Sequence, residues 1–134
     1  MNEILHVGLD VGSTTVKIIV MNDNKDTIYS DYRRHFSDTK KTVCDVLEEL
    51  LLKYPSSSFT VALTGSGAMS SAKFLGVDFI QEVVSCKRVI EKYYPKTDVV
   101  IELGGEDAKI IYFDNSIEQR MNGTCAGGTG AFLD

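Results

Sequence analysis

The sequence predicts an α/β fold, with one complete domain built around a mixed sheet and the opening β-meander of a second such domain. Three observations support this prediction. The apolar pattern passes in order through three strands, a helix, one strand, two helices and three further strands. The first and last groups of strands share a repeated sequence. The 134 residues include 43% hydrophobic and 25% charged side chains, which is typical of a globular protein.

The expected strands combine apolar or alternating residues with turn residues at their ends. A polar cluster at residues 22–26 separates the second strand of the first group from the third. In the middle of the chain, a short buried strand ends at the tight turn Gly65-Ser66-Gly67. The strands are expected at residues 4–10, 16–21, 27–34, 59–64, 99–103, 109–113 and 117–121.

Three helices are expected where the apolar pattern changes to helical spacing. The longest begins near Thr39, has Asp38 or Thr39 as its N-cap, and ends before Pro55. A short helix is expected at residues 68–75 and another at residues 85–94. The apolar face of the longest helix comprises Val43, Val46, Leu47, Leu50, Leu51 and Tyr54.

A 92-residue repeat relates the beginning of the chain to its last third. Asp-Val-Gly-Ser-Thr-Thr-Val-Lys-Ile-Ile, starting at Asp10, aligns without a gap with Glu-Leu-Gly-Gly-Glu-Asp-Ala-Lys-Ile-Ile, starting at Glu102. Each copy has the pattern of a strand, an acidic residue, a glycine turn and a second strand. The repeat therefore predicts two domains, residues 1–97 and residues 98–134.

Composition argues against several classes of protein. The net charge is −5 and no Lys/Arg stripe contains interleaved aromatic residues, so no nucleic-acid partner is expected. No apolar run approaches the length of about 18 residues that spans a membrane, and residues 1–7 lack the basic cluster of a secretory signal. The three cysteines are widely spaced, which argues against a disulfide framework and a self-contained zinc site. We therefore expect a cytoplasmic protein without a membrane partner.

The repeated glycine turns have the residue types of a phosphate-binding site. Gly12 allows the backbone to approach a ligand, and Ser13 and Thr14 would add hydroxyl donors to N–H groups that bind phosphate oxygens. Asp10 would lie within reach of Mg²⁺ bound to the same phosphates. One such turn alone could be a purely structural hairpin. Two equivalent turns, however, favour binding of a polyphosphate from both sides. The sequence has no Walker A motif.

Of five further titratable side chains, three allow more than one interpretation. Lys17 and Lys109 follow the two turns, and each could approach a nucleotide or point to solvent. Glu82, in an apolar setting, could polarise a water molecule or orient a metal ligand, or could simply face the solvent. His6 and His35 are isolated in the sequence, so neither is assigned a catalytic role.

Cys125 lies in a glycine-rich segment at residues 122–134, Asn-Gly-Thr-Cys-Ala-Gly-Gly-Thr-Gly-Ala-Phe-Leu-Asp. Its glycines exclude a helix interior or a packed strand, so we expect an exposed thiol that is available as a metal ligand. An iron–sulfur cluster needs about four thiolates, which a symmetric dimer supplies from two cysteines per subunit. Packing is the favoured role of the other two cysteines, Cys44 and Cys86.

The two glycine turns resemble the phosphate loops of the actin- and hexokinase-like ATPase superfamily, in which two ribonuclease-H-like domains clasp a Mg-nucleotide. Together with the cysteine segment, they resemble the 2-hydroxyacyl-CoA dehydratase activators, the BadF/BadG/BcrA/BcrD ATPase family, over nearly the whole chain. The resemblance implies a ribonuclease-H-like, actin-like ATPase domain in residues 1–97. It also implies that residues 98–134 are the truncated start of a second such domain.

The resemblance also implies functional roles for individual residues. Asp10 and Glu82 are the candidate catalytic residues. Cys125 matches the first of two cysteines per subunit that hold one [4Fe-4S] cluster in a homodimer. The candidate nucleotide-binding residues are Gly12, Ser13, Thr14, Thr15 and Lys17 in the first turn, and Gly104, Gly105, Glu106 and Asp107 in the second.

The function implied by the resemblance couples ATP to electron transfer. ATP binding and hydrolysis to ADP, with Mg²⁺, would drive a low-potential electron from reduced ferredoxin or flavodoxin through the cluster into a 2-hydroxyacyl-CoA dehydratase or related enzyme. The second cluster cysteine and the adenosine-binding loop are expected beyond Asp134, so residues 1–134 alone are expected to be inactive. A sugar or acyl kinase of the same superfamily, or a nucleotide-binding module without turnover, is the alternative.

Overall fold

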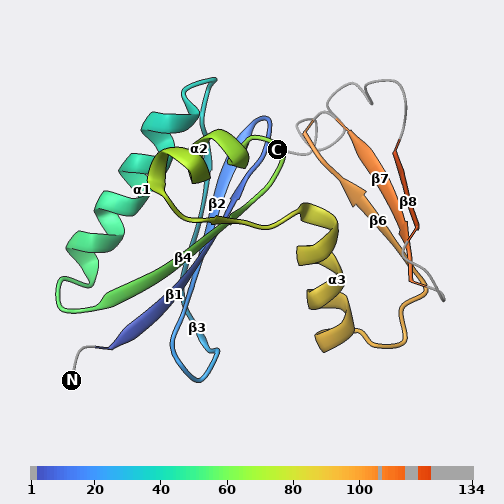
Figure 1. Ribbon diagram of the computed structural model, residues 1–134, viewed down its shortest axis with the longest axis horizontal. Coiled ribbons are helices and arrows are strands. Elements are labelled where there is room, and N and C mark those ends of the chain that lie inside the picture. The colour runs from blue at the N-terminus through green and yellow to red at the C-terminus, as the bar shows by residue number, and fades with distance from the viewer. Residues whose placement is uncertain (1–2, 106, 114–117, 122–134) are drawn as a thin grey trace. The chain divides into compact units, whose positions relative to one another are not determined.

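The computed structural model describes residues 3–105, 107–113 and 118–121. The chain forms two compact units, Met1–Ile80 and Gln81–Asp134, and Figure 1 labels most of their elements. The boundary between sequence domains after residue 97 stays a prediction. The elements of the first unit are β1 (Ile4–Val11), β2 (Thr15–Met21), β3 (Thr27–Arg34), α1 (Thr39–Lys53), β4 (Ser58–Thr64), α2 (Ala68–Leu75) and β5 (Asp78–Phe79).

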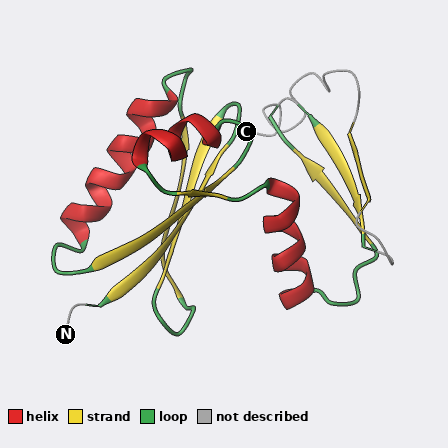
Figure 2. Cartoon of the chain, viewed as in Figure 1, coloured by secondary structure: helices red, strands yellow, loops and turns green. Residues whose placement is uncertain are grey.

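β1 is the central strand of a five-stranded mixed sheet with the order β3-β2-β1-β4-β5, shown as yellow strands in Figure 2. The pairs β1–β2 and β2–β3 are antiparallel, whereas the pairs β1–β4 and β4–β5 are parallel. This arrangement confirms the predicted mixed sheet. The strand β5 is not predictable from the sequence, because two residues are too few to establish an alternating pattern.

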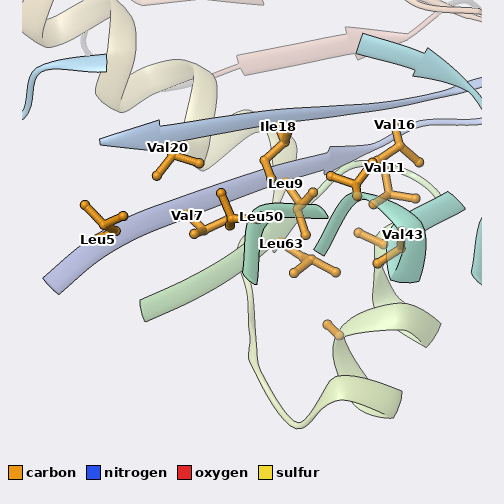
Figure 3. Packing of buried hydrophobic residues seen from close by; sticks show 13 residues of the cluster. Leu5, Val7, Leu9, Val11, Val16, Ile18, Val20, Val43, Leu50 and Leu63 are labelled. Carbon is orange, nitrogen blue, oxygen red and sulfur yellow. The ribbon is translucent and has the colours of Figure 1, made fainter. Parts of the chain in front are cut away.

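One face of this sheet carries the hydrophobic core of the first unit. Along β1, Leu5, Val7, Leu9 and Val11 are buried, because alternate side chains of a strand point to the same face. Figure 3 shows these side chains packed with residues from β2, β4 and α1. The helices α1 and α2 contribute to the same cluster and therefore cover the same face. The other buried members are Val16, Ile18, Val20, Val43, Val46, Leu50, Leu63, Ala68 and Ala72.

The longest helix, α1, begins where the sequence predicts. The Asp38 side chain accepts a hydrogen bond from the Lys41 N–H at 3.2 Å, which confirms Asp38 as the N-cap. Leu50 is buried as expected, but Leu51 is 55% exposed, because one residue further along a helix is about 100° further around it. None of the helices in the described ranges is long and apolar enough to cross a membrane.

The second unit comprises α3 (Glu82–Tyr93), β6 (Val99–Leu103), β7 (Ala108–Tyr112) and β8 (Glu118–Met121). β7 is the middle strand and pairs antiparallel with both neighbours, which confirms the predicted meander. α3 begins three residues before Ser85, its expected start. Glu82 therefore lies in the first helical turn, where a carboxylate interacts favourably with the helix dipole.

Candidate functional site

The first glycine turn joins β1 to β2 and is closed by a backbone hydrogen bond. The Gly12 N–H donates to the carbonyl oxygen of Thr15 at 2.9 Å. Asp10 and Lys17 are register partners across the hairpin, and Lys17 Nζ lies 3.0 Å from Asp10 Oδ2. Both side chains are partly exposed, so the Asp10 carboxylate is accessible at the mouth of the turn.

The second glycine turn, between β6 and β7, repeats this backbone geometry. The Gly104 N–H donates to the carbonyl oxygen of Asp107 at 2.8 Å, and Glu102 and Lys109 are register partners. These four positions are those of the first turn shifted by 92 residues, so the sequence repeat is also a structural repeat. A Cβ atom at Gly104 would collide with the Asp107 carboxylate, so a side chain at this position would displace that of Asp107.

The loop after β4 packs directly against the first turn. The Gly67 N–H donates to the carbonyl oxygen of Val11 at 2.8 Å. Gly65 has a φ of 108°, and a Cβ atom there would lie 2.6 Å from the Val11 carbonyl carbon. A Cβ atom at Gly67 would lie 3.1 Å from the Gly12 carbonyl oxygen. The predicted tight turn at residues 65–67 thus has glycine at positions 65 and 67, because the backbones of two loops touch there.

His35 donates hydrogen bonds to two carbonyl groups of the first turn. Its N–H donates to the Thr14 carbonyl oxygen at 3.1 Å. Its Nδ1 accepts a hydrogen bond from the Ser37 N–H at 3.1 Å, so Nε2 carries the proton and donates to the Gly12 carbonyl oxygen at 3.2 Å. No catalytic role is expected of His35 from the sequence, and the structure gives this buried residue a structural role at the turn. No local sequence signal identifies this role, because Gly12 and His35 are 23 residues apart.

The first turn is held to neighbouring segments by hydrogen bonds that its carbonyl oxygens accept. The carbonyl oxygens of Val11, Gly12 and Thr14 accept hydrogen bonds from Gly67 or His35. Within the part of the chain that the structure describes, the N–H groups of Ser13 and Thr14 have no hydrogen-bond partner. Successive N–H groups without protein partners are able to donate hydrogen bonds to an anion.

Three carboxylates of the second unit lie around the ammonium group of Lys109. Its Nζ lies 2.5 Å from Glu82 Oε2, 3.5 Å from Asp107 Oδ2 and 3.7 Å from Glu102 Oε1. Only 6% of the Lys109 side chain is exposed, so the interpretation that it points to solvent is wrong. Burial by itself lowers the pKa of Lys109, but the hydrogen bond to Glu82 and the three negative charges raise it above its ordinary value. Lys109 is therefore charged at neutral pH.

The other candidate residues are placed as follows. Thr15 is buried at the start of β2, whereas Gly105 is partly exposed in the second turn. Glu82 is brought to this turn by its contact with Lys109, although it precedes Glu102 by 20 residues. Glu106 and Cys125 lie outside the described residues.

The two cysteines that the structure describes are half-buried on helices α1 and α3. Burial and the negative charge of Glu102 raise the pKa of the Cys86 thiol, so Cys86 stays protonated at neutral pH. Over the described ranges, no group of three or more His, Cys, Asp or Glu side chains is arranged to hold a metal ion.

A comparison with protein families shows which family has these features. Residues 7–134 match the profile of the BadF/BadG/BcrA/BcrD ATPase family. The chain belongs to this family. The match includes the two glycine turns and the cysteine segment, and it confirms the resemblance inferred from their residues.

Characterised relatives of this BadF/BadG/BcrA/BcrD ATPase chain are dehydratase activators. The (R)-2-hydroxyglutaryl-CoA dehydratase activating ATPase of Acidaminococcus fermentans is 33% identical over 134 residues, which cover 96% of the chain and 50% of the relative. The 2-hydroxyisocaproyl-CoA dehydratase activator of Clostridioides difficile is 33% identical over 135 residues, covering 96% and 49%. The chain therefore spans about half the length of the curated relatives it matches.

A solved structure extends the similarity to the fold. The activator of the 2-hydroxyisocaproyl-CoA dehydratase from Clostridium difficile, with bound ADPNP, superposes with a TM-score of 0.76 at 30% identity. The superposition covers 97% of this chain and 50% of the activator chain. It confirms the expected ribonuclease-H-like, actin-like ATPase fold for this member of the family.

Proposed function

We propose that this chain is the nucleotide-binding part of an ATP-dependent activator of a 2-hydroxyacyl-CoA dehydratase or a related CoA-substrate enzyme. The observation that carries the proposal is the pair of glycine turns with the same register and the same closing hydrogen bond. Family membership and the ADPNP-bound relative support a nucleotide as the ligand.

In this proposal the first turn binds phosphate oxygens of ATP. The N–H groups and hydroxyls of Ser13 and Thr14 donate to the phosphates, and Lys17 adds positive charge beside them. The partly exposed Asp10 carboxylate suits Mg²⁺, which binds proteins through one or two carboxylates and keeps phosphate and water ligands. The second turn, with Gly104, takes an equivalent phosphate-binding role.

The proposed reaction is attack of a water oxygen on the γ-phosphorus of ATP, with cleavage of the bond to the β–γ bridging oxygen and release of ADP, inorganic phosphate and a proton. Catalysis of this step is mainly electrostatic, because charge develops on the phosphoryl oxygens and can be neutralised by fixed N–H donors. When bound, Mg²⁺ supplies further positive charge. Asp10 and Glu82 are the proposed catalytic carboxylates, Asp10 for the metal or water and Glu82 for orienting a water molecule.

The electron-transfer part of the proposal depends on Cys125. A cysteine among several glycines suits a thiolate ligand, and a homodimer would bring together the ligands of one [4Fe-4S] cluster. Reduced ferredoxin or flavodoxin is the proposed electron donor, and the dehydratase is the acceptor. The names of the activator relatives support the acceptor class.

The nucleotide site is tested by ATP hydrolysis in the complete protein. Asp10→Ala and Gly12→Val are expected to lose most turnover, the first through the metal and the second through a blocked approach to phosphate. Gly8→Val is the matched control, because nothing lies within 4 Å of a Cβ atom at Gly8. Unchanged turnover in both site variants would remove the phosphate-loop assignment.

The cluster is tested by anaerobic iron–sulfur reconstitution of the complete protein, followed by absorption spectroscopy. Cys125→Ala is expected to lose iron incorporation, whereas Cys44→Ala and Cys86→Ala are expected to retain it. Equal iron incorporation in wild type and Cys125→Ala would contradict the cluster assignment.

A further inference from the structure

The buried Lys109 joins three parts of the second unit that are separate in the sequence. Glu82 comes from the first turn of α3, Glu102 from β6 and Asp107 from the glycine turn. The shortest of the three contacts, 2.5 Å, is made with Glu82. One ammonium group thus links the start of a helix to the second turn.

The repeat shows that the turn itself does not require this arrangement. Lys17, the counterpart of Lys109, has Asp10 as its one ion-pair partner among the described residues and keeps 46% of its side chain exposed. Both turns nevertheless have the same closing hydrogen bond and the same register. The burial of Lys109 and its contact with Glu82 are therefore specific to the second turn.

Energetics also points away from a purely stabilising role. Removing an ammonium group and a carboxylate from water is costly, so a buried ion pair adds little net stability compared with a well-packed apolar pair. What such a pair does provide is a fixed geometry for the two charged groups. Here it fixes the carboxylate of Glu82, which is 29% exposed and so retains a surface for a water molecule.

We propose that Lys109 is a positioning residue, which holds the Glu82 carboxylate at the second glycine turn so that Glu82 can act in nucleotide hydrolysis. This inference rests on the proposed ATPase function. Lys109 donates a hydrogen bond to one Glu82 oxygen and leaves the other oxygen of the carboxylate to orient water. Its contact with Asp107 ties the same ammonium group to the turn, where Asp107 packs against Gly104.

The test compares steady-state ATP hydrolysis of four variants of the complete protein with wild type. Lys109→Met is expected to lower kcat by on the order of 10-fold or more, with KM for ATP within about 3-fold, because misplacement of a catalytic group impairs the chemical step. Lys109→Arg keeps the charge and is expected to recover part of kcat. Lys87→Met removes a partly exposed lysine that pairs with Glu91 on α3, and is expected to leave kcat unchanged. Glu82→Gln is expected to lower kcat as well.

A double variant separates positioning from a general effect on folding. If Lys109 acts through Glu82, Lys109→Met in a Glu82→Gln background is expected to change kcat less than about 2-fold. An undiminished loss in that background would overturn the proposal, as would wild-type kcat in Lys109→Met. If Lys109→Met does not fold, the milder Lys109→Arg and Glu82→Gln variants test the proposal instead. Wild-type kcat in both of these variants would overturn the positioning role of Lys109.

The same data separate this proposal from the proposed function. If the wild-type protein neither binds nor hydrolyses ATP, both fail. If wild type hydrolyses ATP and Asp10→Ala abolishes turnover while Glu82→Gln and Lys109→Met retain it, the ATPase function stands, and the roles of Glu82 and Lys109 in it fail.

Discussion

Lys17 and Lys109 occupy equivalent positions in two hairpins of the same register, yet 46% of the Lys17 side chain is exposed and only 6% of the Lys109 side chain is. Within the described ranges, Lys17 has one carboxylate partner, Asp10, whereas Lys109 contacts both Glu102, the equivalent of Asp10, and Glu82 from α3. A common backbone therefore places one lysine at the surface and the other in a buried ion cluster.

This difference predicts unequal effects of the same substitution on stability. Lys17→Met is expected to change the free energy of unfolding by less than about 1 kcal/mol, because an exposed ion pair contributes little. Lys109→Met is expected to cost about 3 kcal/mol or more, because it leaves carboxylates without their buried counter-charge. Urea unfolding at pH 7 measures both values. Equal losses would show that the burial of Lys109 has no energetic consequence.

The backbone contact between Gly65 and Val11 predicts a severe effect of a single methyl group. Gly65→Ala is expected to destabilise the first unit by about 3 kcal/mol or more, because it combines a φ of 108° with a collision against the Val11 carbonyl group. Gly8→Ala, on the same unit, adds a methyl group where nothing lies within 4 Å and is expected to cost less than about 1 kcal/mol. Thermal unfolding of the two variants provides the comparison, and similar melting temperatures would contradict it.

The hydrogen bonds of His35 predict a linked loss of stability and nucleotide affinity. His35→Ala removes the donor to the Gly12 carbonyl and is expected to cost about 2 kcal/mol, because buried groups lose their partners. The released turn is also expected to bind ADPNP more weakly in calorimetric titrations. His6→Ala is the control, since among the described residues the imidazole of His6 bonds only to the exposed side chains of Thr60 and Asp23. Unchanged ADPNP affinity in His35→Ala would show that His35 does not shape the phosphate site.

The charge pairs of Arg33 predict a pH dependence of stability. Its Nε lies 2.6 Å from Asp31 Oδ2, and its guanidinium group also donates to both carboxylate oxygens of Glu49. Burial raises the pKa of Asp31, but the hydrogen bonds from Arg33 and from the Tyr32 N–H hold it below its ordinary value. Ionised Asp31 therefore stabilises the fold above the unfolded-state pKa of about 3.9, and this contribution is lost as the pH falls through the lower folded-state pKa.

Asp31→Asn is accordingly expected to lose less stability than wild type when the pH falls from 6 to 2, with a difference of up to about 1 kcal/mol. Urea unfolding across this pH range measures the difference between the two proteins. Parallel pH profiles would contradict a stabilising role for the Asp31 carboxylate.

Much of the fold was predictable because it follows from local patterns. The strand at residues 27–34, the helix at residues 68–75 and the strand at residues 99–103 have the predicted bounds, since periodicity and turn residues are properties of short segments. The N-cap Asp38 was predictable for the same reason. The missed features were the two-residue β5 and the early start of α3 at Glu82, where apolar residues obscured the helical spacing.

The candidate site was predictable only in part. The two glycine turns were identified because a repeat places the same residue types 92 positions apart. His35 was not identified as a support of the first turn, because its bond to Gly12 joins residues that no local motif connects. The burial of Lys109 was missed because, in a strand, sequence alone does not show which face is covered.

The sequence by itself determined the succession of helices and strands, the repeated turns and the membership of the BadF/BadG/BcrA/BcrD ATPase family. These depend on residue type, spacing and periodicity, which the linear chain contains. Tertiary structure decided which charges meet: the contact between Glu82 and Lys109 joins residues 27 positions apart, from a helix start and a strand. Whether a charged side chain is solvated or buried depends on the elements that fold around it, so Lys17 and Lys109 differ although their local sequences correspond.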